Sequence, residues 1–126
     1  MLRLLLPASI AALLLAGCAG EMPPMFSKNQ SSIGPVLTDA SGRTLYLFDD
    51  DEPGESACVG KCLEYWPPVL ADNNASPNGR FDVIKRPDGR PQWAIQGKPL
   101  YYWNQDKAPG DTKGDKYGDN WHAVRM

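Results

Sequence analysis

The chain of 126 residues has few of the side chains and motifs on which catalysis or nucleic-acid binding depends. It contains a single histidine, His122, and no nucleophile elbow, phosphate-binding glycine loop or zinc-protease helix. It also lacks a basic tract that would neutralise phosphates, and its formal net charge is -2. We therefore expect a non-enzymatic protein with no cofactor and no nucleic-acid partner.

Long apolar runs are also scarce, and the longest, Leu4–Leu15, is too short to span a bilayer permanently. It follows the basic Arg3 and leads into small residues, which is the layout of a signal peptide over Met1–Gly17. The end of this leader resembles a bacterial lipobox, in which the thiol of Cys18 takes a diacylglycerol before cleavage. The alternative is an ordinary secreted protein with a free cysteine, which an oxidising envelope disfavours.

A lipid-anchored N-terminus at Cys18 would keep the protein in the cell envelope, attached to a membrane. Each buried CH₂ of an acyl chain contributes roughly 0.8 kcal/mol, so several chains give stable anchoring. Ala19 follows the cysteine in place of an aspartate that resembles an inner-membrane retention signal. If the source has two membranes, we expect the periplasmic face of the outer one.

The composition predicts one small domain that is rich in turns. Apolar residues make up 42% of the chain, which also contains twelve glycines and twelve prolines. Residues 18–35 are polar, interrupted by proline and without a sustained period, so they are interpreted as the lipidated N-terminus and a flexible tether. The folded domain is expected over residues 36–126.

An internal duplication organises this domain. The segment Gly42–Asp51 matches Gly97–Asp106 at a spacing of 55 residues, and each has the pattern G-[RK]-x-L-Y-x-[FW]-x-x-D. The same spacing relates Trp66 to Trp121. The repeat copies are placed at about 36–70 and 91–125, and two pseudo-symmetric halves of one domain are expected.

These motifs resemble the secreted repeat of unknown function, a family of predicted bacterial lipoproteins with paired Y-x-[FWY]-x-x-D motifs. The matching residues are Tyr46, Phe48 and Asp51 in the first copy and Tyr101, Trp103 and Asp106 in the second. The resemblance covers about Val36 to Arg125. It implies a secreted repeat unit and an envelope location, and little about mechanism.

The pattern of the chain predicts a mainly β, antiparallel domain of about seven short strands. Residues 36–38 and 44–48 flank a turn and should form a hairpin, and residues 81–103 should form a meander with no room for a crossover helix. In the strand 44–48 large apolar side chains point to both faces, which indicates a central strand covered on both sides. Its aromatic pair, Tyr46 and Phe48, is expected in the core, with a ligand-stacking shelf as the alternative.

Two hypotheses apply to Cys58 and Cys62, the cysteines that remain after Cys18 is acylated. In an oxidising envelope a disulfide is the simpler explanation. The alternative is soft-metal binding by Cys58, Cys62 and His122, because a C-x-x-x-C pair with a distant histidine resembles the copper site of periplasmic copper chaperones, and thiolates suit Cu(I).

Two further hypotheses concern the carboxylates. Asp51 and Asp106 each follow a strand, where a carboxylate can accept hydrogen bonds from backbone N–H groups of the next turn. The polar segment 111–120 resembles a calcium loop, but Lys113 stands where a ligand is needed, so a solvated loop is favoured. Taken together, the sequence predicts a membrane-anchored lipoprotein that presents a small β domain to an envelope protein or a small ligand.

Overall fold

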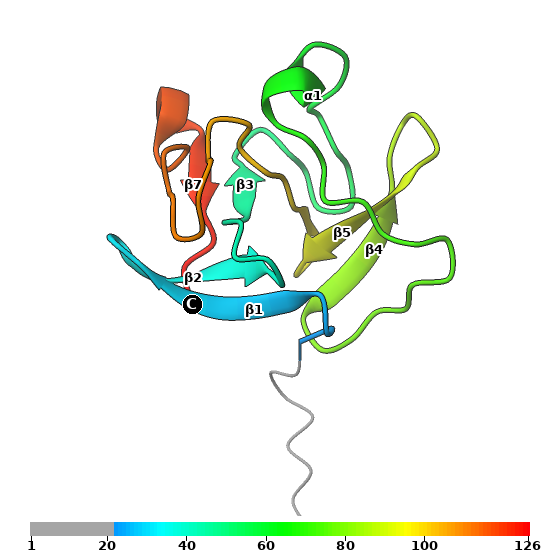
Figure 1. The fold of residues 1–126 in the computed structure, drawn as a ribbon. Coiled ribbons are helices and arrows are strands. Elements are labelled where there is room, and N and C mark those ends of the chain that lie inside the picture. Colours follow the sequence, from blue (N-terminus) through cyan, green and yellow to red (C-terminus); the bar gives the residue numbers. More distant parts are fainter. Residues whose placement is uncertain (1–21) are drawn as a thin grey trace, which may run out of the picture.

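The structure, a computed structural model, describes residues 22–126. The predicted signal peptide and Cys18 lie outside the described residues. The elements follow the order β1 (Phe26–Ser31), β2 (Gly34–Asp39), β3 (Tyr46–Phe48), α1 (Cys62–Tyr65), β4 (Phe81–Lys85), β5 (Pro91–Ile95), β6 (Lys98–Pro99), the 3-10 helix η1 (Tyr117–Asp119) and β7 (Trp121–Ala123) (Figure 1). No helix within residues 22–126 is long and apolar enough to cross a membrane.

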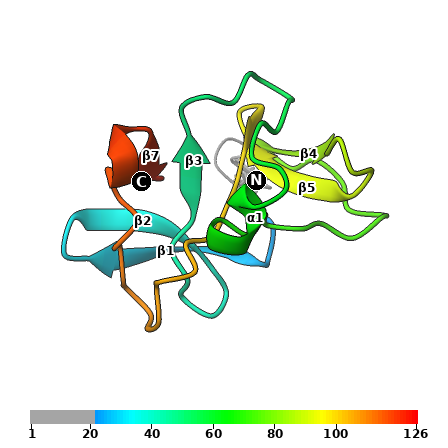
Figure 2. The same cartoon turned by 90° about the horizontal axis from the view of Figure 1, so that it is seen from above.

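Every pair of these strands is antiparallel, which confirms the predicted fold class. β1 pairs with β2, β3 pairs with β7, and β4, β5 and β6 form the predicted meander. The hairpin expected over residues 36–48 is present in short form, because Leu45 N–H donates to the carbonyl of Leu37 at 3.0 Å and Asp39 N–H to the carbonyl of Arg43 at 2.9 Å. Viewed from above, β2 and β7 lie on one side and β4 and β5 on the other (Figure 2).

The predicted tether is too long, because the domain begins ten residues before position 36, at Phe26. β1 pairs along its whole length with β2, and the Phe26 ring is buried and stacks on Phe81 with ring centroids 4.6 Å apart. Phe26 and Phe81 are themselves 55 residues apart, so the duplication includes β1 and β4. The sequence did not predict β1 because its remaining residues are polar and at most half-buried, as an edge strand allows.

The two copies interlock at the centre of the domain. β3 of the first copy pairs with β7 of the second, and its other edge meets Tyr101. There the N–H of Tyr46 donates to the carbonyl of Tyr101 at 2.8 Å, and the N–H of Tyr101 donates back at 3.0 Å. β3 is therefore central, as expected, with Leu45 and Tyr46 fully buried on opposite faces.

We call the line along which β3 meets β7 and Tyr101 the seam. Beside the seam, each half contains a ring of three backbone hydrogen bonds that joins three chain segments. In each ring every residue donates its N–H to the next and accepts from the previous one, at 2.8–3.0 Å. The rings consist of Leu37, Val124 and Leu45, and of Trp93, Val69 and Leu100. Since each ring takes residues from both copies, neither copy completes its backbone hydrogen bonding alone.

The seam separates two apolar cores. One lies around Phe26, Phe81 and both hydrogen-bond rings, and the other around Tyr46, Tyr101, Trp66, Trp103 and Trp121. Within residues 22–126, every buried polar side-chain atom has a hydrogen-bond partner. This part of the chain therefore contains both apolar cores and provides partners for its buried polar side chains.

Candidate functional site

The family motif forms a reciprocal clasp across the seam. The hydroxyl of Tyr46 donates to Asp106 Oδ2 at 2.6 Å, and the hydroxyl of Tyr101 donates to Asp51 Oδ2 at 2.8 Å. Each motif tyrosine therefore binds the motif aspartate of the other copy. The second oxygen of each carboxylate accepts a backbone N–H, from Ala57 at 2.7 Å and from Lys113 at 3.0 Å, which is the role expected for these aspartates.

Burial governs the protonation of the clasp. Desolvation raises the pKa of the Asp51 and Asp106 carboxyl groups, against the lowering effect of their hydrogen bonds. The same desolvation raises the pKa of the Tyr46 and Tyr101 hydroxyls well above the ordinary value, and the neighbouring carboxylates add to the shift. Both tyrosines therefore stay neutral hydrogen-bond donors at physiological pH.

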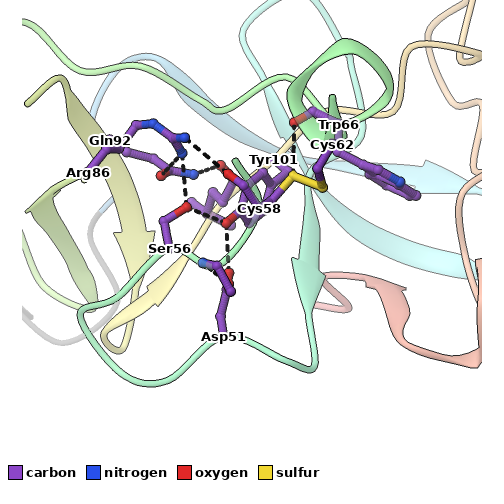
Figure 3. Close-up of a disulfide and its surroundings, with 10 residues drawn as sticks. Asp51, Ser56, Cys58, Cys62, Trp66, Arg86, Gln92 and Tyr101 are labelled. Carbon is purple, nitrogen blue, oxygen red and sulfur yellow. Dashed lines mark hydrogen bonds between the residues drawn. A yellow bond between two sulfur atoms is a disulfide. The ribbon is translucent and has the colours of Figure 1, made fainter. Parts of the chain in front are cut away.

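A buried arginine supports one half of the clasp (Figure 3). Nη1 of Arg86 donates to Ser56 Oγ at 2.9 Å and to Gln92 Oε1 at 2.8 Å, while Nη2 donates to the carbonyl of Cys58 at 3.1 Å. Ser56 in turn shares a hydrogen bond of 2.6 Å with the hydroxyl of Tyr101. Sequence reasoning missed Arg86, because burial of its guanidinium depends on a loop thirty residues away.

In the other half of the clasp, at Tyr46, the backbone of a glycine takes the place of the Arg86 network. Gly114 N–H donates to the hydroxyl of Tyr46 at 3.2 Å. A Cβ at this position would lie 2.7 Å from the Trp66 ring and 3.0 Å from the Trp103 ring. The absence of a side chain at Gly114 therefore allows the backbone to approach the aromatic core.

Cys58 and Cys62 form a disulfide, as predicted. It links the loop that contacts Arg86 to the first residue of α1. His122 Nε2 pairs instead with Asp49 Oδ2 at 2.7 Å. Among residues 22–126 no three histidine, cysteine or acidic side chains gather as a metal site. The structure therefore does not assemble the three ligands of the copper hypothesis.

We expect freshly isolated oxidised protein to show no reactive thiol from Cys58 or Cys62, because their sulfurs are bonded to each other. Thiol labelling after unfolding should detect these two thiols only when a reductant is added, and mass spectrometry should show a mass lower by two hydrogens than the reduced form. Two thiols that react without reductant would contradict the disulfide. Both thiolates would then be free to bind a soft metal, as the copper hypothesis requires.

Two acidic side chains of the calcium-like loop, Asp111 and Asp115, accept hydrogen bonds from backbone N–H groups. Asp111 Oδ2 accepts from the N–H groups of Lys107 and Ala108, at 2.8 and 3.0 Å. Asp115 accepts from the N–H of Ala123 at 3.0 Å and pairs with Arg125 at 2.9 Å. These contacts give both carboxylates a structural role in the loop that precedes β7.

An aromatic pocket lies beside the disulfide, between the two copies. It has a volume of about 360 Å³ and is lined by Cys62, Tyr65, Trp66, Trp103, Tyr117 and Trp121. Trp66 and Trp121 stack with ring centroids 3.8 Å apart and an angle of 1°. Tyr65 and Tyr117 are each 53% exposed, so their rings form the open walls of the pocket.

The sequence contained one signal for this pocket. Cys62 and Tyr117 are 55 residues apart, as are Trp66 and Trp121, so the duplication relates both pairs. That two of them would stack and leave an open pocket depends on how the copies meet. The alternative shelf at Tyr46 and Phe48 is not formed, because Tyr46 is fully buried and Phe48 stacks on Trp121 at 4.1 Å.

The fold and the clasp define a class of protein: a duplicated antiparallel β domain. Its two copies are joined by the pairing of β3 with β7 and by two tyrosine–aspartate hydrogen bonds. The model of the secreted repeat of unknown function matches residues 29–70 and 82–125, and the chain belongs to that family. These matches begin earlier than the copies proposed from sequence. This agrees with the structure, in which β1 pairs with β2 in the first copy and β4 pairs with β5 in the second. Neither a curated protein nor a solved structure matches the chain.

Proposed function

We propose that this protein is a lipid-anchored, non-enzymatic binding module of the cell envelope, which presents its aromatic pocket away from the membrane. The position of the pocket carries this proposal. The described chain enters the domain at Phe26, in the first core, whereas the pocket is built on the second core. In Figure 1, β1 lies at the lower end of the domain and α1, which supplies Cys62 and Tyr65, at the upper end.

The anchor would hold the domain close to the membrane. Phe26 follows Cys18 by eight residues, and a fully extended chain of that length spans roughly 28 Å. Acyl chains on Cys18 would therefore leave the domain near the lipid headgroups, with the end that contains Phe26 toward them. If the source has two membranes, Ala19 after the acylated cysteine favours the outer one.

A binding role, as opposed to catalysis, is supported by how the buried polar groups are used. Asp51, Asp106 and the two motif tyrosines bind one another across the seam. Arg86 is fully buried and directs its guanidinium to four neighbouring oxygen atoms of the domain, one of which belongs to the carboxylate of Asp88. Groups engaged in this way hold the pocket in shape and have no free proton to exchange with a substrate.

Replacing Cys18 by serine is expected to move the protein from the membrane fraction to the soluble fraction, because the thiol is the only group in the lipobox that accepts the diacylglycerol. Fractionation followed by immunoblotting measures this. The double variant Cys58→Ser/Cys62→Ser is the control, since these residues bond to each other and should not affect anchoring. A Cys18→Ser protein that stays in the membrane fraction would refute lipid anchoring.

A further inference from the structure

The side chains that line the aromatic pocket indicate the chemistry of its ligand. We propose that the aromatic pocket takes a planar ligand of one or two fused rings that carries no negative charge and has hydrogen-bond acceptors, such as carbonyl or ether oxygens. This inference deepens the proposed binding function by naming its ligand class.

The walls of the pocket favour a flat ring. Trp103 packs against Trp66 and Tyr117, with ring centroids 4.3 and 4.7 Å apart. Tyr65 and Tyr117 leave about half of their surface open to solvent beside these indoles. A planar ligand can stack on or pack edge-to-face against several rings at once, whereas a bulky aliphatic one cannot.

The size of the pocket limits the ligand to a small one. At about 360 Å³ it lies near the lower end of the volumes of known ligand sites, which begin at roughly 300 Å³. One ring or two fused rings fit such a space, and an extended oligosaccharide or a peptide segment does not. Both copies contribute three lining residues each, so the pocket requires the assembled domain.

The lining of the pocket selects against anions. None of its six lining side chains is acidic or basic. An anion that entered would exchange water for aromatic rings and a disulfide without a charged partner, which is unfavourable. An uncharged ligand loses far less solvation, and a cation would gain cation–π attraction from the rings.

Hydrogen-bond donors of the pocket walls favour a ligand with acceptor oxygens. Within residues 22–126 the indole nitrogens of Trp66, Trp103 and Trp121 meet no acceptor, and none of these nitrogens is a fully buried atom without a partner. Figure 3 shows the indole nitrogen of Trp66 at the end of the ring away from the disulfide. An indole N–H only donates, so carbonyl or ether oxygens of a ligand match it.

Both walls are held in place before a ligand arrives. The disulfide ties Cys62, at the start of α1, to Cys58. On the other wall Tyr117 lies between Lys116, at φ 65°, and Asp119, at φ 61°, and both of these non-glycine residues have left-handed backbone. Such strain concentrates at binding sites, and a preformed pocket loses less conformational entropy on binding.

Coumarin is the probe, because it is flat, bicyclic, uncharged and carries two acceptor oxygens but no donor. Titrated into oxidised protein of residues 22–126, it should shift the indole N–H signals of Trp66, Trp103 and Trp121 in an NMR spectrum. The indole of Trp93 belongs to the first core and serves as an internal control that should not shift. Naphthalene has the same shape without acceptors, and should bind about three- to tenfold more weakly, as expected for the loss of one hydrogen bond.

The double variant Tyr65→Ala/Tyr117→Ala should weaken coumarin binding by at least about tenfold, because it removes both exposed walls. Leu70→Ala is the matched control, since Leu70 is 43% exposed and does not line the pocket. Both variants change exposed side chains, and a cooperative urea-unfolding transition followed by far-ultraviolet circular dichroism would show that they are folded.

Three results would overturn the inference: no coumarin binding at millimolar concentration by folded protein, equal binding by the tyrosine double variant, or tighter binding of methyl β-glucoside than of coumarin. Equal affinity for naphthalene and coumarin would refute the acceptor requirement. All of these are measured on protein without Cys18, so they are independent of the fractionation result that tests the anchor.

Discussion

Replacing Trp121 by alanine is expected to lower the free energy of unfolding by about 3–5 kcal/mol, the range for truncating a buried aromatic side chain. The Trp121 ring is 4% exposed and packs between two parallel rings, Trp66 at 3.8 Å and Phe48 at 4.1 Å. It also meets the edge of Tyr101 at 5.2 Å. Its removal leaves a cavity at the seam, where both copies depend on the same contacts.

Urea unfolding followed by circular dichroism measures this change. Tyr65→Ala is the control, because Tyr65 is half-exposed and its truncation should change stability by less than about 1 kcal/mol. Trp103, which is 5% exposed, should behave like Trp121. A Trp121→Ala protein as stable as the Tyr65→Ala protein would mean that the stacked rings do not hold the copies together.

Raising the pH above 10 is expected to destabilise the domain steeply. Burial raises the folded-state pKa of the Tyr46 and Tyr101 hydroxyls well above the ordinary value of 10.0, and the neighbouring carboxylates raise it further. The stability that these tyrosines contribute is therefore complete below pH 10 and is lost above it, where the unfolded chain ionises and the folded chain does not. Each of the two should remove about 1.4 kcal/mol per pH unit in that range.

Urea unfolding at pH 8, 10, 11 and 12 measures this slope. In the double variant Tyr46→Phe/Tyr101→Phe the slope should fall by about 2.7 kcal/mol per pH unit, since both hydroxyls are gone. That variant should also be less stable at pH 7, because Asp51 and Asp106 keep only their backbone donors. A wild-type stability that stays constant from pH 8 to pH 12 would contradict the buried clasp.

Short-range patterns in the sequence predicted much of the architecture. The spacing of 55 residues relates Tyr46 to Tyr101 and Trp66 to Trp121 in the sequence itself. Apolar side chains on both faces of β3 indicated a central strand, and the structure confirms it with Leu45 and Tyr46 fully buried. The disulfide also followed from the sequence, because only two cysteines remain beyond Cys18.

Only the tertiary structure decided which motif aspartate each motif tyrosine binds. The sequence showed two tyrosines and two aspartates in identical motifs, but a repeat does not specify whether Tyr46 bonds to Asp51 of its own copy or to Asp106 of the other. Within a strand, residues two positions apart share a face and the motif aspartate lies beyond the strand end, so local geometry left this open. Because β3 of the first copy pairs with β7 of the second, Tyr46 lies beside Asp106 of the other copy.

Two other features depend on the same long-range geometry. β1 is recognisable as a strand only through its pairing with β2 and the stack of Phe26 on Phe81, because polar edge residues have no hydrophobic pattern. The aromatic pocket exists only where α1 and η1, from different copies, come together over the stacked Trp66 and Trp121. The sequence determined the repeated units and their apolar faces, since these follow from local periodicity. The packing of one copy against the other determined the clasp and the pocket, since it joins side chains about 50–60 residues apart, beyond the reach of any local pattern.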